Sequence, residues 1–160
     1  MTVHIWRIAA VTPAYPAEDM SGAGAQATGG RWNAKGVAVL YTAENRALAC
    51  LETLVHAVST RLPLNRILVR FDVPDDVWQA ASYFDRQDAK NVGWDVEPAG
   101  MVSISAGTKW LTGAKSALLV VPSVIVPEER NVLINPAHLD AARITATKIR
   151  KWTYDTRLKN

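Results

Sequence analysis

Arg31 is the first candidate for binding a charged ligand. It follows Gly29 and Gly30, and two glycines in a row let the backbone turn sharply and come close to a ligand. A guanidinium group at such a turn can hold two phosphate oxygens at once. The same position also suits a structural salt bridge or a solvent-exposed arginine at the start of a strand, and the spacing alone favours this simpler interpretation. Glu52 is the first partner to consider for it.

Glu52 is the second candidate, because it is a carboxylate inside an otherwise apolar stretch. Leu51 precedes it, and Leu54 and Val55 follow closely. A buried acid costs free energy unless another group pairs with it or uses it. On a helix face it could bind ribose hydroxyls and stabilise the positive charge that develops at the anomeric carbon in glycosidic cleavage. A glutamate hydrogen-bonded to the neighbouring sheet explains the position equally well, and a structural bond is the simpler role for His56.

Tyr41 and Ser123 are two further candidates, each with a structural alternative. Tyr41 ends an apolar run just before the predicted helix, where its ring could stack on a flat heterocycle or pack into the core. Ser123 interrupts another apolar run, and its hydroxyl could donate to an amide or a phosphate. The sequence has no Ser/His/Asp order, metal-ligand cluster or Walker-type loop to accompany them. We therefore expect no metal site, and we expect the single Cys50 to be a small buried thiol.

The elements that must position these side chains form an α+β pattern. The clearest is a helix over about 43–58, whose apolar residues recur at helical spacing, with Thr42 as the predicted N-cap and Glu44 in the first turn. We predict strands at 4–8, 37–41, 66–73, 117–121, 131–136 (ending in a turn) and 144–154, an extended segment at 123–126 and a short helix at 107–115. A long irregular loop at 12–30 and a weakly patterned region at 75–106 lie between them. Together these elements predict one domain over residues 1–160 with a mixed or antiparallel central sheet.

Composition limits the class of protein. A chain of 160 residues with 49% hydrophobic and 21% charged residues is typical of one globular domain. No apolar run reaches the roughly 18 residues of a membrane span, and no signal-peptide pattern begins the chain, so we expect a cytoplasmic protein without membrane contact. The net charge of +3 is mild, and the basic residues gather only near the C-terminus. A solvent-exposed basic strand explains them better than a nucleic-acid interface.

The candidate residues lie in motifs that resemble the RES domain. These motifs are residues 29–33, residues 40–44 leading into 47–52, and residues 121–129 continuing through Asn131 to 135–136. The family is named for an arginine, a glutamate and a serine, which correspond here to Arg31, Glu52 and Ser123. The likeness spans nearly the whole chain, and the region 75–106 contributes little to it.

The resemblance implies a toxin of a bacterial type II toxin–antitoxin system. Its partner would be an antitoxin with an Xre-type helix-turn-helix domain, to which any DNA contact would belong, and the toxin would form a homodimer. The fold would be similar to that of ADP-ribosyltransferases. The activity would be NAD+ depletion through cleavage of the nicotinamide–ribose bond, with water or phosphate as acceptor. The alternative is mono-ADP-ribosyl transfer to a protein target. NAD+ is then a substrate, and no cofactor is expected.

The resemblance also implies a role for each candidate residue. Arg31 would hold the NAD+ diphosphate, and Tyr41 would pack against the nicotinamide or its ribose. Glu52 would bind ribose hydroxyls and stabilise the cationic transition state, while Ser123 would orient the ligand through its amide or a phosphate. Because the pyridinium is already a good leaving group, such an enzyme needs positioning and charge stabilisation more than a general acid. Asn135 is a weaker ligand candidate, since an asparagine before a proline is typical of a turn.

Overall fold

A seven-stranded sheet forms the framework of the computed structural model, which describes residues 1–57 and 60–158. The strands lie in the order β4-β5-β6-β2-β1-β3-β7, with bounds β1 Thr2–Ala10, β2 Leu40–Ala43, β3 Arg66–Pro74, β4 Ser82–Tyr83, β5 Leu118–Pro122, β6 Arg130–Ile134 and β7 Thr145–Lys151. The β4–β5 pair is parallel, and the other pairs are antiparallel. This mixed sheet with few helices confirms the predicted α+β class.

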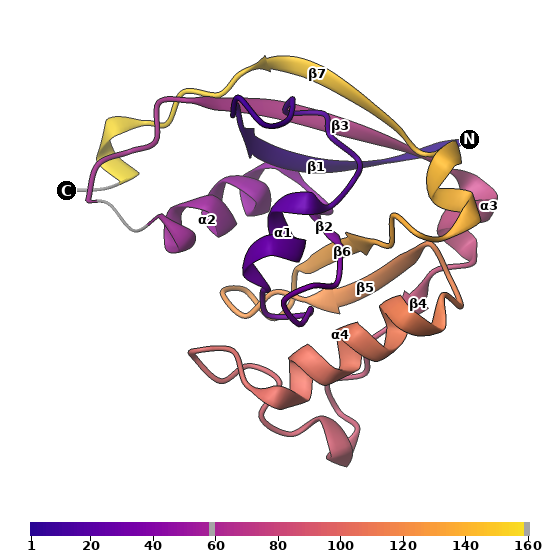
Figure 1. The fold of residues 1–160 in the computed structure, drawn as a ribbon. Coiled ribbons are helices and arrows are strands. Elements are labelled where there is room, and N and C mark those ends of the chain that lie inside the picture. The colour runs from indigo at the N-terminus through magenta and orange to yellow at the C-terminus, as the bar shows by residue number, and fades with distance from the viewer. Residues whose placement is uncertain (58–59, 159–160) are drawn as a thin grey trace.

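The helices attached to the sheet are short. They are α1 Ala23–Thr28, α2 Arg46–His56, α3 Asp75–Gln79 and α4 Met101–Gly113, with 3-10 turns at Ala89–Asn91, Leu139–Arg143 and Thr156–Leu158. Helix α2 lies beside β1 and β2, and Figure 1 shows α4 running along the β4–β5 side of the sheet. Within residues 1–57 and 60–158, no helix has the length and apolar character needed to cross a membrane.

Strand β5 shows why the sheet is covered on both faces at this side. All of its residues are buried. Leu118 and Val120 belong to one apolar cluster, which includes residues of β1 and β3, whereas Leu119 and Val121 pack in a second cluster with Trp110 of α4. Side chains alternate between faces along a strand, so a continuous apolar run is what a doubly covered strand requires. Strand β5 is therefore covered on both faces, and the site is built beyond its last residue.

Helix α2 begins later than the sequence predicts. Its N-cap is Asn45, whose Oδ1 accepts a hydrogen bond of 2.8 Å from the backbone N–H of Leu48. Thr42, the predicted cap, lies within β2, and its hydroxyl donates to the carbonyl of Val132. The predicted cap was wrong because the strand continues to Ala43 and occupies the residues where the helix would have started.

The two ends of the predicted helix also differ from those observed. Glu44 precedes the helix, and its Oε2 accepts a hydrogen bond of 2.9 Å from Nε of Arg130 instead of lying in the first turn. The helix ends at His56, and the predicted last residue, Val58, lies outside the described residues. The predicted apolar face is confirmed in part: Leu48 and Leu54 are buried, together with Ala49, whereas Val55 is exposed and Leu51 is half-buried.

Three predicted irregular or extended segments are organised differently. The loop at 12–30 contains α1, and the strand predicted at 37–41 is β2 at Leu40–Ala43. The segment 123–126, predicted to be extended, forms a turn in which the N–H of Glu129 donates to the carbonyl of Val126. This prediction was wrong because the polar Ser123 side chain bonds the turn backbone, which apolar periodicity does not reveal.

Helix α4 begins in the weakly patterned region, at Met101, where the sequence predicts a helix only from Gly107. The sequence does not reveal the start of this helix because Gly107, a residue of poor helix propensity, lies in its middle. A Cβ atom at this position would overlap the backbone carbonyl of Trp32. The glycine therefore lets α4 pack directly against the segment that carries Arg31.

Candidate active site

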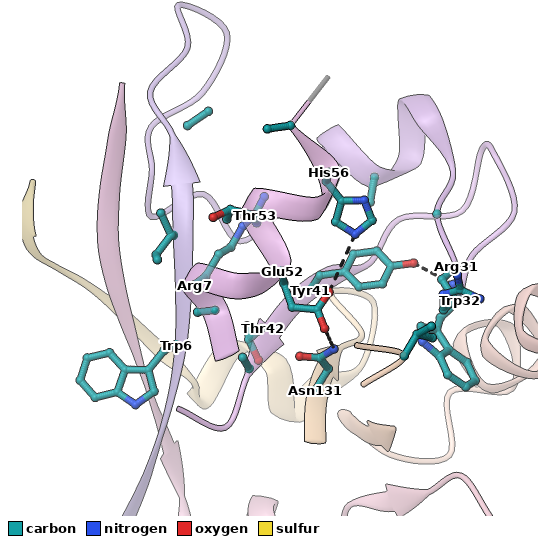
Figure 2. Close-up of a pocket in the computed structure, with 18 of the residues that line it drawn as sticks. Trp6, Arg7, Arg31, Trp32, Tyr41, Thr42, Glu52, Thr53, His56 and Asn131 are labelled. Carbon is teal, nitrogen blue, oxygen red and sulfur yellow. Dashed lines mark hydrogen bonds and ion pairs between the residues drawn. The ribbon is translucent and has the colours of Figure 1, made fainter. Parts of the chain in front are cut away.

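A cavity of about 450 Å³ lies beside α2, and Arg31, Tyr41 and Glu52 all line it. Figure 2 shows Glu52 near His56 and Asn131, with Tyr41 and Arg31 to one side and Arg7 to the other. A cavity of this size is typical of small-molecule sites. The structure thus brings together three of the four site residues that the sequence singled out, although they come from a loop, a strand and a helix.

Glu52 is held by one of its two carboxylate oxygens. Oε1 accepts a hydrogen bond of 2.8 Å from the hydroxyl of Ser123 and one of 2.7 Å from Nδ2 of Asn131. Oε2 lies 3.9 Å from Nε2 of His56, whose side chain is 80% exposed. The two donors fix the carboxylate and leave Oε2 available to a ligand in the cavity.

Ser123 lies behind Glu52 and does not line the cavity. Its side chain is fully buried. Besides donating to Glu52, the hydroxyl accepts hydrogen bonds from the backbone N–H groups of Ile125 (3.1 Å) and Val126 (3.2 Å). A serine hydroxyl has one donor and two acceptor positions, and all three are occupied. In this geometry Ser123 positions the carboxylate and the turn that follows β5.

Asn131, on β6, is a site residue to which the sequence analysis assigned no role. Its Nδ2 donates to Glu52, and its Oδ1 is buried with no hydrogen-bond partner among the described residues. A buried acceptor without a partner costs free energy, and Asn131 lines the cavity. A ligand that donates a hydrogen bond to Oδ1 would remove this cost.

Arg7, on β1, is a second residue that the sequence analysis missed. It lines the cavity and makes no hydrogen bond or ion pair with any residue in 1–57 or 60–158. Burial lowers the pKa of its guanidinium, and the charge of Asp19 opposes this only in part. The signal was present in the sequence, because β-strand alternation places Arg7 on the same face as Ile5 and Ala9, which are buried. A guanidinium in such surroundings attracts an anion.

Arg31 lines the cavity, but its guanidinium is bound to residues that do not. Nη1 donates to the carbonyls of Trp94 (3.2 Å) and Val96 (2.9 Å), and Nη2 pairs with Oε2 of Glu97 at 2.6 Å. The Arg31 side chain is 16% exposed, against 78% for Glu97. The weakly patterned region of the sequence therefore supplies the acceptors for this arginine.

Tyr41 is the second residue of β2, and hydrogen bonds of its hydroxyl hold the side chain in place. The hydroxyl donates to Oδ1 of Asn33 (2.6 Å) and accepts from the N–H of Trp32 (3.0 Å). Burial raises the pKa of Tyr41 to about 12, although the N–H of Trp32 and the charge of Arg31 act in the opposite direction. A Cβ at Gly30 would lie 2.7 Å from this hydroxyl. The glycine turn before Arg31 is therefore required for the approach of Tyr41.

Two remaining candidates have structural roles. Asn135 is buried, its Nδ2 donates to the carbonyl of Leu111, and its Oδ1 accepts from the N–H of Ala137 in the following turn. Cys50 is partly buried, and burial raises its pKa. In the part of the chain that the structure describes, no three His, Cys, Asp or Glu side chains are grouped as a metal site requires.

Comparisons with known proteins agree in family and in fold. The model of the RES domain family matches residues 4–157. The Prs ADP-ribosylating toxin of Sphingobium sp. (strain YBL2) is 58% identical over 158 residues, which cover 99% of this chain and 98% of that protein. Toxin Res of Yersinia enterocolitica is 35% identical over 146 residues, covering 91% and 93%. A chain of the solved M. tuberculosis MbcT–MbcA toxin–antitoxin complex has the same fold. Its TM-score is 0.60 at 13% identity, and the match covers 94% of this chain and 86% of that chain.

Proposed function

Because the chain belongs to the RES domain family, we propose that it is the toxin of a toxin–antitoxin system and that it consumes NAD+ by breaking the nicotinamide–ribose bond. The observation that carries this proposal is the carboxylate of Glu52, with one oxygen fixed by two donors and the other available in a cavity that basic side chains also line. NAD+ combines a cationic reacting centre with an anionic diphosphate, so it needs both kinds of charge.

The cationic transition state would be stabilised by Glu52. When the bond from the ribose anomeric carbon to the pyridinium nitrogen breaks, its electron pair goes to the nitrogen and nicotinamide leaves as a neutral molecule. Positive charge then develops on the ribose, and a carboxylate held in place stabilises it without reorganising. Oε2 would bind a ribose hydroxyl, and the orphaned Oδ1 of Asn131 offers a second acceptor beside it. An acceptor then adds to the anomeric carbon and loses its proton to solvent.

The diphosphate would be bound by arginines. Arg7 is the stronger candidate on geometric grounds, since its guanidinium has no competing partner in the described chain. Arg31 would contribute from the glycine turn, and Tyr41 between them would pack against the nicotinamide or its ribose. Ser123, whose hydroxyl is fully used, would act by holding Glu52.

Product analysis of NAD+ turnover tests this function. We expect the purified chain, freed of any co-purifying partner, to release nicotinamide from NAD+, and chromatography with and without added phosphate identifies the acceptor. The matched control is Glu128→Gln, which removes a carboxylate that does not line the cavity. If NAD+ stays intact in buffer, in phosphate and in a cell extract that supplies protein acceptors, the proposal is wrong.

ADP-ribosyl transfer to a protein is the second candidate for the same site. It is favoured by the relative of 58% identity, which is named as an ADP-ribosylating toxin. Radiolabelled NAD+ separates the two, since transfer puts the label on a macromolecule and hydrolysis or phosphorolysis leaves it on a small product.

The partners follow from the same proposal. We expect an antitoxin with an Xre-type helix-turn-helix domain, a homodimeric toxin and action in the cytoplasm, where NAD+ is available. Co-expression with the neighbouring open reading frame, followed by size-exclusion chromatography with light scattering, measures the complex and the free toxin. A monomer in both preparations contradicts the expected homodimer.

A further inference from the structure

Arg31 is bound in this structure as if its anionic ligand were already present. Three acceptors from the segment 94–97 surround its guanidinium, and the shortest contact, 2.6 Å, is the one to the carboxylate of Glu97. None of the residues 94–97 lines the cavity. The segment therefore holds the arginine from the rim of the site and not from its interior.

The hydrogen-bonding inventory shows which part of Arg31 remains for a ligand. A guanidinium has five N–H groups, two of them on each Nη atom and one on Nε. The Nη1 pair is used by the carbonyls of Trp94 and Val96, whereas Nη2 gives one hydrogen to Glu97. Nε donates to no residue in 1–57 or 60–158, so a phosphate that binds two donors of Arg31 would use Nε and Nη2, and Nη2 is the nitrogen that the Glu97 carboxylate contacts.

The two kinds of acceptor differ in how firmly they are fixed. Trp94 is buried and stacks on Trp32, with ring centroids 6.3 Å apart, so its carbonyl is held by the core. The side chain of Glu97 is 78% exposed and can turn into solvent at little cost. An exposed ion pair of this kind contributes little to stability and is screened by salt. The carbonyl of Val96 belongs to a half-exposed residue, but as a backbone group next to Trp94 it cannot turn away by a side-chain rotation. The two carbonyls are therefore the more fixed support, and the carboxylate is the exchangeable one.

We propose that Glu97 is a built-in competitor of the anionic substrate: it occupies Arg31 in the empty site and is displaced when a diphosphate binds, while the carbonyls of Trp94 and Val96 keep the guanidinium in place. This inference rests on the proposed function for the choice of a diphosphate. It gives the region 75–106, which carries no motif, a specific part in setting the affinity of the site.

A double-mutant cycle on ligand binding tests the competition without requiring turnover. Isothermal titration calorimetry measures the affinity of ADP, which carries the diphosphate of NAD+, for the wild-type chain, Glu97→Gln, Arg31→Ala and the double variant. We expect Glu97→Gln to bind ADP about two- to fivefold more tightly, the range that an exposed ion pair supports. In the Arg31→Ala background the same substitution should have no effect. Thermal unfolding of each variant verifies that it is folded.

Asp95→Asn is the matched control, because Asp95 is a nearby exposed carboxylate that makes no hydrogen bond or ion pair with Arg31. An equal gain from Asp95→Asn would mean that general charge, not competition for Arg31, controls the affinity. Weaker ADP binding by Glu97→Gln would mean that Glu97 positions Arg31, and unchanged binding, or no binding by any variant, would equally overturn the inference. The nicotinamide-release assay judges the proposed function separately, so failure of one does not decide the other.

Discussion

The two charged sides of the cavity are built in different ways. On the carboxylate side, Glu52 is held by side chains from two recognisable elements, Ser123 after β5 and Asn131 on β6. On the arginine side, Arg31 is held by backbone carbonyls and one exposed carboxylate from a segment without a motif. The carboxylate is fixed by the buried Ser123 and the partly buried Asn131, whereas the arginine keeps an exchangeable partner. A group that stabilises charge in a transition state needs a fixed position, and a group that admits a ligand can tolerate exchange.

The largest expected effect is loss of activity on the carboxylate side. Glu52→Gln keeps an Oε1 acceptor for Ser123 and Asn131 but removes the negative charge. We expect nicotinamide release to fall about 10²–10³-fold, as when a charge-stabilising group is lost from an enzyme site, with ADP affinity nearly unchanged. Steady-state turnover and calorimetry measure the two quantities. Activity within threefold of wild type would show that the charge of Glu52 is not used.

A substitution in α4 can disturb the packing beside Arg31. Gly107→Ala would force a methyl group onto the carbonyl of Trp32, next to Arg31, and overpacking of this kind costs about 1–3 kcal/mol. We expect a lower free energy of unfolding in denaturant titrations. Gly113→Ala in the same helix is the control, since its Cβ would meet nothing within 4 Å and helix propensity predicts a neutral or slightly stabilising change. Equal stability of the two variants would contradict the close approach.

Ser123→Ala sharpens the comparison, because it separates positioning from ligand contact. We expect kcat to fall about tenfold to a hundredfold with KM little changed, since a hydrogen bond to a charged group contributes about 1.5–3 kcal/mol. Ser103→Ala is the control, a buried serine of α4 whose hydroxyl makes only a 3.4 Å contact with the carbonyl of Gly100. If Ser123→Ala instead raises KM and leaves kcat intact, the hydroxyl contacts the ligand, as the family resemblance implies.

The last prediction concerns the pH dependence of stability near Tyr41, which affects the protein only at high pH. Its pKa is raised to about 12 in the folded state, against about 10 in an unfolded chain. The folded protein therefore retains a proton that the unfolded chain loses, so this stabilisation is complete below pH 10 and is lost between pH 10 and about 12. We expect the free energy of unfolding of wild type, relative to Tyr41→Phe, to fall by about 1–3 kcal/mol over that range. Parallel pH curves for the two proteins would contradict the buried phenol.

The sequence by itself determined the α+β class, most of the strands, part of the apolar face of α2 and the three charged or aromatic residues that line the cavity. Alternation and helical spacing are local properties, and a polar residue inside a regular apolar pattern stands out wherever it occurs. Glu52 could be named on this basis, and Arg31 from the two glycines that precede it. Arg7 carried the same signal as Glu52, since it interrupts the buried face of β1. The N-cap at Asn45 was missed because Thr42 and Asn45 are both suitable capping residues. Only the extent of β2, which includes Thr42, excludes the first of them.

The tertiary structure alone decided which groups hold the charged side chains. Ser123 and Asn131 reach Glu52 across 71 and 79 residues, and Trp94 reaches Arg31 across 63. Each such hydrogen bond to a charged group contributes only about 1.5–3 kcal/mol. Its partner is selected by strand register and turn geometry, which leave no periodic trace in the chain. A sequence can thus mark a side chain as costly to bury, but only the folded arrangement shows what compensates that cost.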